Sequence, residues 1–333
     1  FSATHLVKAS WDAITSKLAG DEYDYVAAVD MLVAKITEEL SPLHVALEDK
    51  AIQMELTFLG HDDKISIGLG RGCKVYTAAD LPAVGAVDWE RLYDIPVAMV
   101  TGTNGKSTTV RLAAAIGAAA GKCVGLSSSD WVRIGDEILD EGDYSGPAGA
   151  RLAVRDSRVE MAIIETARGG LMRRGLPVPT ADVCLLTNVA ADHLGSYGVM
   201  DVTALADAKF QLSEAVRPGG RLVLNADDPE LVARSARYSG NITWFAMNFN
   251  QASLDVWIAN GGRAAFVSDG HMMLARDGEI HMVLAVDDFI PALGGAAQFN
   301  IYNALGAIGL ADGLGLPIDA MAKGLAGFTD SPD

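Results

Sequence analysis

The chain has 333 residues, of which half are hydrophobic and 21% are charged, a composition typical of a globular protein with about two ordinary domains. Its formal net charge of −17 argues against nucleic acid or an anionic membrane surface as a partner, because both require a surplus of Lys and Arg. Three cysteines without a C-x-x-C pair, and no apolar run of membrane-spanning length, exclude a disulfide framework, a zinc-ribbon site and a membrane span. We therefore expect a cytoplasmic protein.

Residues 1–92 are predicted to form a small N-terminal α/β domain. Residues 25–40 have the apolar spacing of a helix, and residues 44–48 and 51–59 have the apolar content of strands. The glycine-rich segment 68–72 is predicted to be a turn. A phosphate-binding role for it is the weaker alternative, because no helix follows it.

From residue 95 onward, apolar runs alternate with helical stretches. This alternation predicts βαβ units and a mostly parallel sheet covered by helices on both faces. Ligands of such sheets bind at the carboxyl ends of the strands, so the residues after each run are the candidates for function. The predicted strands are 95–100, 124–127, 159–164, 183–187 and 221–225, and the predicted helices are 107–120, 202–216 and 229–238.

The first of these strands leads into the loop Thr-Gly-Thr-Asn-Gly-Lys-Ser-Thr at residues 101–108. A glycine-rich loop between a buried strand and a helix start presents backbone N–H groups to a phosphate. Lys106 would reach the β- and γ-phosphates of a nucleotide, and the hydroxyl of Ser107 or Thr108 would bind Mg²⁺. The strict P-loop pattern has glycine where this chain has Val100. The strand and helix on either side still predict a phosphate-binding loop.

Charged residues follow two further strands. Glu165 directly follows the run 159–164. A single carboxylate at this edge of the sheet is a suitable ligand for Mg²⁺. Asp192 and His193 follow the run 183–187 and are adjacent, so one of them at most is expected to point inward. A role for His193 at a metal or phosphate is favoured over a core or surface position because of its place at the strand end.

Lys209 interrupts an apolar stripe in the predicted helix 202–216. The stripe steps by three and four residues, through Val202, Leu205, Lys209, Leu212 and Val216. One interpretation is a lysine whose stem packs while its ammonium reaches solvent. The other is a lysine held inward for chemistry.

Two polar segments leave alternatives open. Asn300 and Asn303 lie one turn apart on a predicted helix, where their amides either read a purine edge or cap the helix. The segment Ala-Asp-Asp-Pro at 226–229 either faces the ligand or caps the helix that follows it.

These motifs, in this order, resemble those of the Mur ligase superfamily, which includes the peptidoglycan amino-acid ligases, folylpolyglutamate synthetase and cyanophycin synthetase. Within that superfamily they are most similar to the Mur-like module of cyanophycin synthetase. The resemblance covers about residues 90–330. The ATP loop of that family also lacks the first glycine of the strict P-loop pattern, as this chain does at Val100. The shared segments beyond the loop are 142–147, 165–171, 188–195, 224–229 and 299–304.

The resemblance implies a role for each motif residue. Ser107 or Thr108 would bind one Mg²⁺ together with Glu165, and His193 would contribute to a second metal position. Lys209 matches a family lysine that is often carbamylated by CO₂, and its carbamate would help to fix the second metal. The implied catalytic residues are Lys106, Glu165, His193 and Lys209. ATP would be held by Gly102, Thr103, Asn104, Gly105, Lys106, Ser107 and Thr108, with Asn300 and Asn303 on the adenine side.

The resemblance also implies an activity and a domain order. The expected reaction is ATP-dependent amide formation between a carboxylate substrate and an amino acid or amine, through an acyl phosphate, with ATP and one or two Mg²⁺ ions. Separately from the resemblance, we expect the protein to be a homo-oligomer. Residues 1–92 would select the acid and residues 93–330 would form the ATP-binding domain, with the family's C-terminal Rossmann-like domain absent from the given residues. The alternatives are a muramyl-peptide or folylpoly-γ-glutamate type ligase, or a nucleotide-binding subunit that needs a partner for catalysis.

Overall fold

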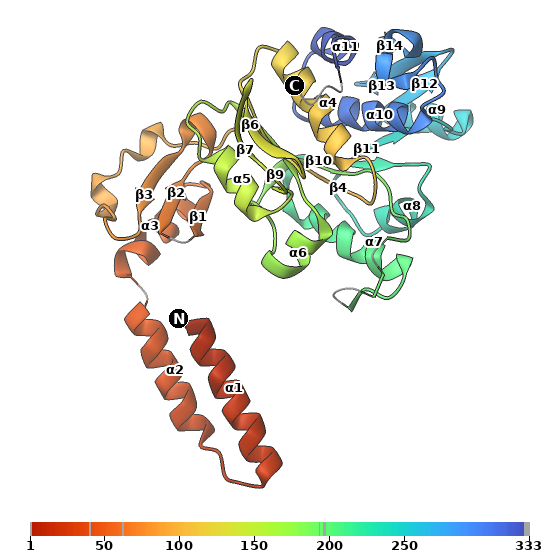
Figure 1. Cartoon of the computed structure of the whole chain (residues 1–333). Helices are drawn as coiled ribbons and strands as arrows, with labels where there is room; N and C mark the ends of the chain where they lie inside the picture. The colour runs from red at the N-terminus through yellow and green to blue at the C-terminus, as the bar shows by residue number, and fades with distance from the viewer. Residues whose placement is uncertain (1, 40, 62, 193, 196–197, 330–333) are drawn as a thin grey trace.

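The computed structural model describes residues 2–39, 41–61, 63–192, 194–195 and 198–329, and Figure 1 shows their arrangement. The N-terminal segment forms a hairpin of two helices, α1 (Ser2–Ala19) and α2 (Tyr25–Glu39). The second of them confirms the helix predicted over 25–40. A third helix, α3 (Pro42–Gln53), leads into an antiparallel sheet of β1 (Phe58–His61), β2 (Lys64–Ile67) and β3 (Lys74–Thr77).

Two strand predictions in this region are wrong. Residues 44–48 lie within α3, and most of residues 51–59 belong to the end of α3 and to the turn before β1. The helix begins because the Ser41 side chain accepts a hydrogen bond from the backbone N–H of His44, and Pro42 occupies the first helical turn. The glycine-rich segment 68–72 contains a short 3₁₀ turn (Gly70–Gly72), as predicted.

The three-stranded unit is anchored to the rest of the chain by polar contacts. Arg155 donates to the carbonyl of Leu59 at 2.8 Å and to the Ser66 hydroxyl at 3.0 Å. The backbone N–H of Arg71 donates to the Val159 carbonyl at 2.8 Å. This unit therefore packs directly on the larger part of the molecule.

Within the described residues, one large sheet holds eleven strands in the order β14-β13-β12-β11-β10-β9-β4-β8-β5-β6-β7. The seven strands from β12 to β5 pair in parallel, and an antiparallel extension of two strands closes each edge. The sheet confirms the predicted mostly parallel α/β fold. Its strands are β4 (Val97–Thr101), β5 (Val124–Ser127), β6 (Trp131–Ile134), β7 (Glu137–Glu141), β8 (Met161–Glu165), β9 (Ala181–Leu186), β10 (Val216–Asn225), β11 (Asn241–Ala246), β12 (Arg263–Ser268), β13 (His271–Arg276) and β14 (Glu279–Ala285).

Helices cover both faces of this sheet, which explains its continuous apolar strands. In β4, Ala98 and Val100 join one hydrophobic core while Val97 and Met99 join the other, and all four are buried. The first core is closed by α4 (Lys106–Ala119), α10 (Gln298–Gly313) and α11 (Ile318–Ala326). The second is closed mainly by α5 (Pro147–Val154), α7 (Val202–Phe210) and α8 (Pro229–Ser235). Two further helices are α6 (Arg168–Arg174) and α9 (Gln251–Ala259).

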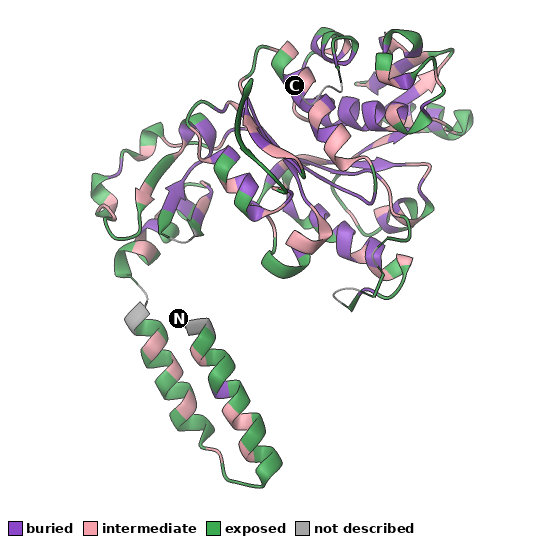
Figure 2. Ribbon diagram, viewed as in Figure 1, coloured by how far each residue is buried: buried purple, intermediate pink, exposed green. Residues whose placement is uncertain are grey.

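Burial follows this architecture, as Figure 2 shows, with buried residues concentrated in the large sheet and its covering helices. The α1–α2 hairpin is mostly exposed, with half-buried residues where its two helices meet. Across the described part of the chain, no helix combines the length and the apolar character that a membrane crossing requires.

Candidate functional site

The predicted phosphate loop joins the end of β4 to the start of α4, and two glycines allow its path. Gly105 caps α4 with a φ of 81°, and a Cβ there would lie 2.1 Å from the Asn303 Oδ1. Gly102 has a φ of 151°, and a Cβ there would lie 1.8 Å from the Thr187 Oγ1. Both positions need glycine for its conformation and for the close approach of neighbouring side chains.

The loop is held by the segment that follows β9. The Asn188 side chain accepts from the backbone N–H of Asn104 and donates to its carbonyl, both at 3.0 Å. The Thr187 hydroxyl donates to the same carbonyl at 2.7 Å. On the other side of the loop, the backbone N–H of Ala190 donates to the Thr103 hydroxyl at 3.1 Å. We did not assign this positioning role to Asn188 from the sequence, although its place directly after a buried strand was a usable signal.

Glu165 ends β8, which pairs in parallel with β4 so that Glu165 lies opposite Val100. Its side chain is buried, and its Oε2 accepts from the backbone N–H of Ser129 at 3.1 Å. The Ser107 hydroxyl lies 3.0 Å from the Ser129 hydroxyl. Ser129 therefore contacts both the phosphate loop and the Glu165 carboxylate. Burial raises the pKa of the Glu165 carboxyl, and the nearby Lys106 ammonium opposes that shift.

These groups fit Mg²⁺ and phosphate. A carboxylate and a hydroxyl are the hard oxygen ligands that Mg²⁺ takes beside phosphate and water oxygens. Within the described residues, the buried hydroxyl of Thr166, which follows Glu165 directly, has no hydrogen-bond partner. Lys106 donates to the Thr103 carbonyl within its own loop at 3.1 Å, so its ammonium remains close to the phosphate position.

Lys209 is buried and donates from its Nζ to the carbonyl of Gly102 at 2.6 Å. Burial, reinforced by the cations of Lys106 and Arg168, lowers the pKa of Lys209 to about 7. The interpretation in which its ammonium reaches solvent is therefore wrong.

The helix predicted over 202–216 is too long. The α-helix ends at Phe210, the segment Gln211–Ala215 is a 3₁₀ turn, and Val216 opens β10. The predicted five-residue stripe therefore does not lie on one continuous helix, although Lys209 itself is turned inward.

His193, expected at the second metal position, lies outside the described residues.

The segment at the end of β10 caps the helix that follows it, and both of its aspartates line a cavity beside the phosphate loop. Asp228 caps α8 by accepting from the backbone N–H groups of Glu230 and Leu231. Asp227 accepts from the Tyr302 hydroxyl at 2.7 Å, and burial together with this hydrogen bond raises the pKa of Tyr302 to about 12.

A cavity of about 710 Å³ opens beside the phosphate loop. Asn303 lies on its wall and is buried. Asn300 does not line the cavity and donates instead to the Pro291 carbonyl at 2.9 Å. The exposed ring of Phe299 also lines the cavity and was not predicted from the sequence, although its spacing from Asn303 places both on one helix face. The lining residues are Asn104, Gly105, Thr108, Asn188, Asn225, Asp227, Asp228, Pro229, Phe299, Tyr302 and Asn303.

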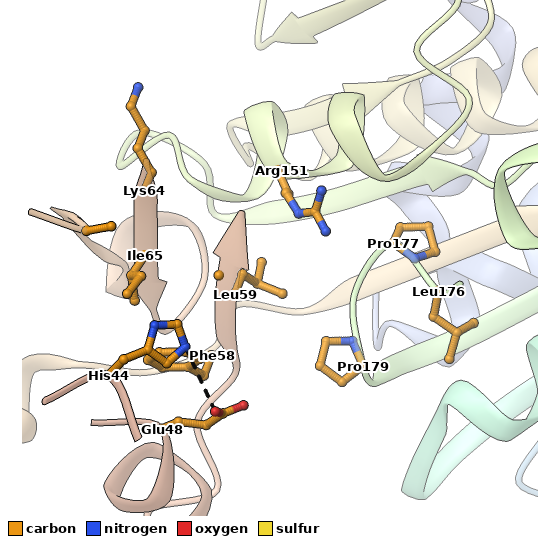
Figure 3. Close-up of a pocket in the computed structure, with 12 residues that line it drawn as sticks. His44, Glu48, Phe58, Leu59, Lys64, Ile65, Arg151, Leu176, Pro177 and Pro179 are labelled. Atoms are coloured by element: carbon orange, nitrogen blue, oxygen red, sulfur yellow. Dashed lines mark ion pairs between the residues drawn. The ribbon is translucent and has the colours of Figure 1, made fainter. Parts of the chain in front are cut away.

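A second cavity of about 620 Å³ lies between the three-stranded unit and the central domain (Figure 3). Figure 3 shows His44 and Glu48 on one side and Arg151 with two prolines on the other. The His44 Nε2 lies 4.0 Å from the Glu48 carboxylate. The lining residues are His44, Glu48, Phe58, Leu59, Gly60, Lys64, Ile65, Ala78, Arg151, Leu176, Pro177 and Pro179.

Comparison with known protein families gives a match to the Mur ligase middle domain over residues 100–311. The cyanophycin synthetase of Nostoc sp. is 39% identical over 237 residues, which cover 71% of this chain and 26% of that protein. The UDP-N-acetylmuramoylalanine–D-glutamate ligase of Chlorobium limicola is 29% identical over 235 residues, which cover 70% of this chain and 47% of that protein. The chain thus spans about a quarter of the length of the cyanophycin synthetases it matches.

Solved structures show the same fold. A UDP-N-acetylmuramoyl-L-alanyl-D-glutamate–2,6-diaminopimelate ligase aligns with a TM-score of 0.54 and 18% identity over 72% of this chain and 47% of that chain. MurF from Acinetobacter baumannii aligns with a TM-score of 0.51 and 18% identity over 71% of this chain and 46% of that chain. On the strength of the match over residues 100–311, the chain belongs to the Mur ligase family through that family's middle domain.

Proposed function

We propose that the protein is an ATP- and Mg²⁺-dependent ligase that forms an amide bond between a carboxylate substrate and an amino acid or amine. The observation that carries the proposal is the meeting of the phosphate loop with buried Glu165 at the ends of two paired strands. The 710 Å³ cavity beside the loop has the size of a small-molecule site. The similarity to cyanophycin synthetases supports this branch of the family.

In this proposal the cavity holds the nucleoside. Asn303 faces the base from α10, and the exposed Phe299 ring offers a surface on which the base stacks. The phosphates lie on the backbone N–H groups of residues 102–108 and at the N-terminus of α4. Lys106 then shifts from the Thr103 carbonyl to the phosphate oxygens.

Ser107 or Thr108, with Glu165, would hold Mg²⁺, and His193 with a carbamylated Lys209 would hold a second ion. When bound, Mg²⁺ neutralises negative charge on the phosphate oxygens. An oxygen of the substrate carboxylate attacks the γ-phosphorus, the bond to the ADP oxygen breaks, and an acyl phosphate results. The amine nitrogen then attacks the acyl carbon, phosphate leaves with the bonding electrons, and the nitrogen loses a proton to give the amide. Lys106 stabilises the transferring phosphoryl group throughout.

Two alternatives remain distinguishable from this proposal: a muramyl-peptide or folylpoly-γ-glutamate type ligase, and a nucleotide-binding subunit that depends on a partner. The test is phosphate release by the full-length protein with ATP, Mg²⁺ and separate pools of amino acids, short peptides, muramyl-peptides and folates, followed by the mass of the product. An amide product of an amino acid or peptide supports the proposal. Release only with a muramyl-peptide or a folate favours the first alternative, and ATP binding without release under any pool favours the second.

Glu165→Gln is expected to raise the Mg²⁺ concentration needed for half-maximal phosphate release by about tenfold or more, because the neutral amide loses the charge that binds the cation. Glu141→Gln is the matched control, since Glu141 is an exposed carboxylate on the edge strand β7. A Mg²⁺ titration of the three proteins measures the effect. An unchanged Mg²⁺ requirement in Glu165→Gln would remove this residue from the metal site.

We further propose that the cavity of Figure 3 holds part of the acid substrate, so that the N-terminal unit contributes to the choice of acid. Arg151 from α5 supplies a cationic group for a carboxylate, whereas the Lys64 ammonium points away from Arg151 in Figure 3. Phe58 and the prolines Pro177 and Pro179 supply apolar walls. The two sides of this cavity come from the two parts of the chain, so both parts would shape the ligand.

Arg151→Ala is expected to raise the KM for the acid by about tenfold to a hundredfold, the effect of losing one hydrogen bond to a charged group, while the KM for ATP stays unchanged. Lys74→Ala is the control, because Lys74 is exposed on the neighbouring strand β3 and does not line the cavity. Steady-state kinetics with the acid identified in the screen provide both constants. An unchanged acid KM in Arg151→Ala would place the acid elsewhere.

A further inference from the structure

The α1–α2 hairpin projects away from the rest of the molecule (Figure 1). Its two helices contact each other, and the Tyr23 hydroxyl donates to the Ala9 carbonyl at 3.0 Å. Among residues 4–37, whose side chains the structure describes, Ala9 is the one buried residue. Two helices alone bury too little apolar surface to be stable, so this hairpin requires further packing.

Each helix carries an exposed apolar stripe with the spacing of a coiled-coil seam. The α1 stripe consists of Val7, Trp11, Ile14 and Leu18, which step by four, three and four residues. These side chains are 56–83% exposed. Ala9 is two residues from both Val7 and Trp11, so the α1 stripe lies on the side of the helix that faces away from α2.

The α2 stripe consists of Val26, Val29, Val33 and Ile36, which step by three, four and three residues. These side chains are 43–72% exposed. Valine and isoleucine at such positions pack well between parallel or antiparallel helices. Both stripes therefore have the form of helix-packing surfaces, and neither has a partner within the described chain.

We propose that the hairpin joins copies of this chain, with the α1 stripe of one copy packed against the α2 stripe of another. Each stripe offers roughly 100 Å² per side chain, so one contact buries on the order of 400 Å² on each copy, about half of what each partner contributes to an interface of standard size. A copy that uses both of its stripes buries on the order of 800 Å². The charges are complementary: α1 has two lysines against one aspartate, and α2 has three acids against one lysine. A pairing of α1 with α2 is therefore favoured over pairing of α2 with itself.

A lipid surface fits the hairpin less well. Amphipathic helices that bind membranes carry a polar face rich in Lys and Arg. The two helices together hold three lysines against four acids, and the whole chain has a net charge of −17. A second copy is the occupant that this composition favours.

The test is the mass of the full chain in solution, measured by light scattering after size exclusion at several micromolar concentrations. A mass of at least twice the 34.9 kDa of one chain is expected for the wild type. Ile14→Glu and Val33→Glu should each shift the protein towards the mass of one chain, because each places a charge in the packed seam. Ala34→Glu should keep the wild-type mass, because Ala34 is exposed but lies about 100° around the helix from Val33.

Circular dichroism and ATP binding check that the variants remain folded, since the hairpin lies away from the nucleotide cavity. A monomeric wild type would overturn the proposal. An oligomer that survives both glutamate substitutions would also overturn it, by showing that copies associate through another surface. A monomer that floats with anionic phospholipid vesicles, and loses this in Val33→Glu, would replace the second copy by a membrane.

Discussion

Lys106→Ala is expected to slow ATP turnover by about 10²–10³-fold while the protein stays folded. Lys106 is the first residue of α4, beside the position expected for the phosphates. The positive charge of its ammonium acts to lower the pKa of the nearby Glu165 carboxyl. Removing one group that stabilises transition-state charge costs roughly 2–4 kcal/mol. The measurement is phosphate release in the presence of the active substrate pool, with circular dichroism to confirm the fold.

Lys122→Ala is the matched control, because Lys122 is an exposed lysine just beyond the other end of the same helix. Its turnover should equal that of the wild type. Near-normal turnover in Lys106→Ala would contradict the assignment of the ATP loop, whichever acid the enzyme uses.

Lys209→Ala is expected to lose most activity and to regain part of it with added bicarbonate or short carboxylates. A neutral amine reacts with CO₂ to give a carbamate and a proton, and the lowered pKa of about 7 leaves much of the Lys209 amine neutral near pH 7. The carbamate would turn a buried cation into an anion that a metal neutralises. A small carboxylate can occupy the space of the lost side chain and supply the same charge.

The variant Lys209→Met separates this account from a structural one. Methionine retains the packed stem but cannot form a carbamate or donate to the Gly102 carbonyl. If Lys209 only holds the loop through that hydrogen bond, both variants should be less stable, and added carboxylate should not restore activity. Recovery in Lys209→Ala, with little recovery in the bulkier Lys209→Met, is the result that supports a carbamate.

The central sheet and its phosphate loop were predictable because their signals are local. A strand buried on both faces reads as an unbroken apolar run, as in β4, β8 and β9. The loop 101–108 and Glu165 follow such runs directly, so their place at one edge of the sheet followed from parallel pairing. The exposed edge strand β7 carries mostly charged residues, and no apolar run marks it.

The errors arose where apolar content was used without helix-start signals. The residues of α3 were predicted to be strands although Ser41 and Pro42 mark a helix start. The predicted helix after residue 202 was continued into β10, because its apolar spacing persists through a 3₁₀ turn.

Other features of the site depend on segments that are far apart in sequence. The hydrogen bonds of Asn188 to the loop cross 84 residues, and that of Lys209 to Gly102 crosses 107. The pattern could identify a lysine that interrupts an apolar stripe, but not the carbonyl to which it donates. The cavity of Figure 3 likewise forms only where the N-terminal unit packs on α5. The sequence of either segment alone does not predict this packing.

The most direct test of the ligase mechanism is to follow a heavy-oxygen label from the carboxylate of the acid substrate. The reaction is run with ATP, Mg²⁺, the labelled acid and the amine, and the released phosphate is analysed by mass spectrometry. An acyl phosphate predicts one labelled oxygen in each phosphate released with the amide, because the bond between that oxygen and the acyl carbon breaks when the amine attacks. Unlabelled phosphate, or label found in AMP, would contradict the account.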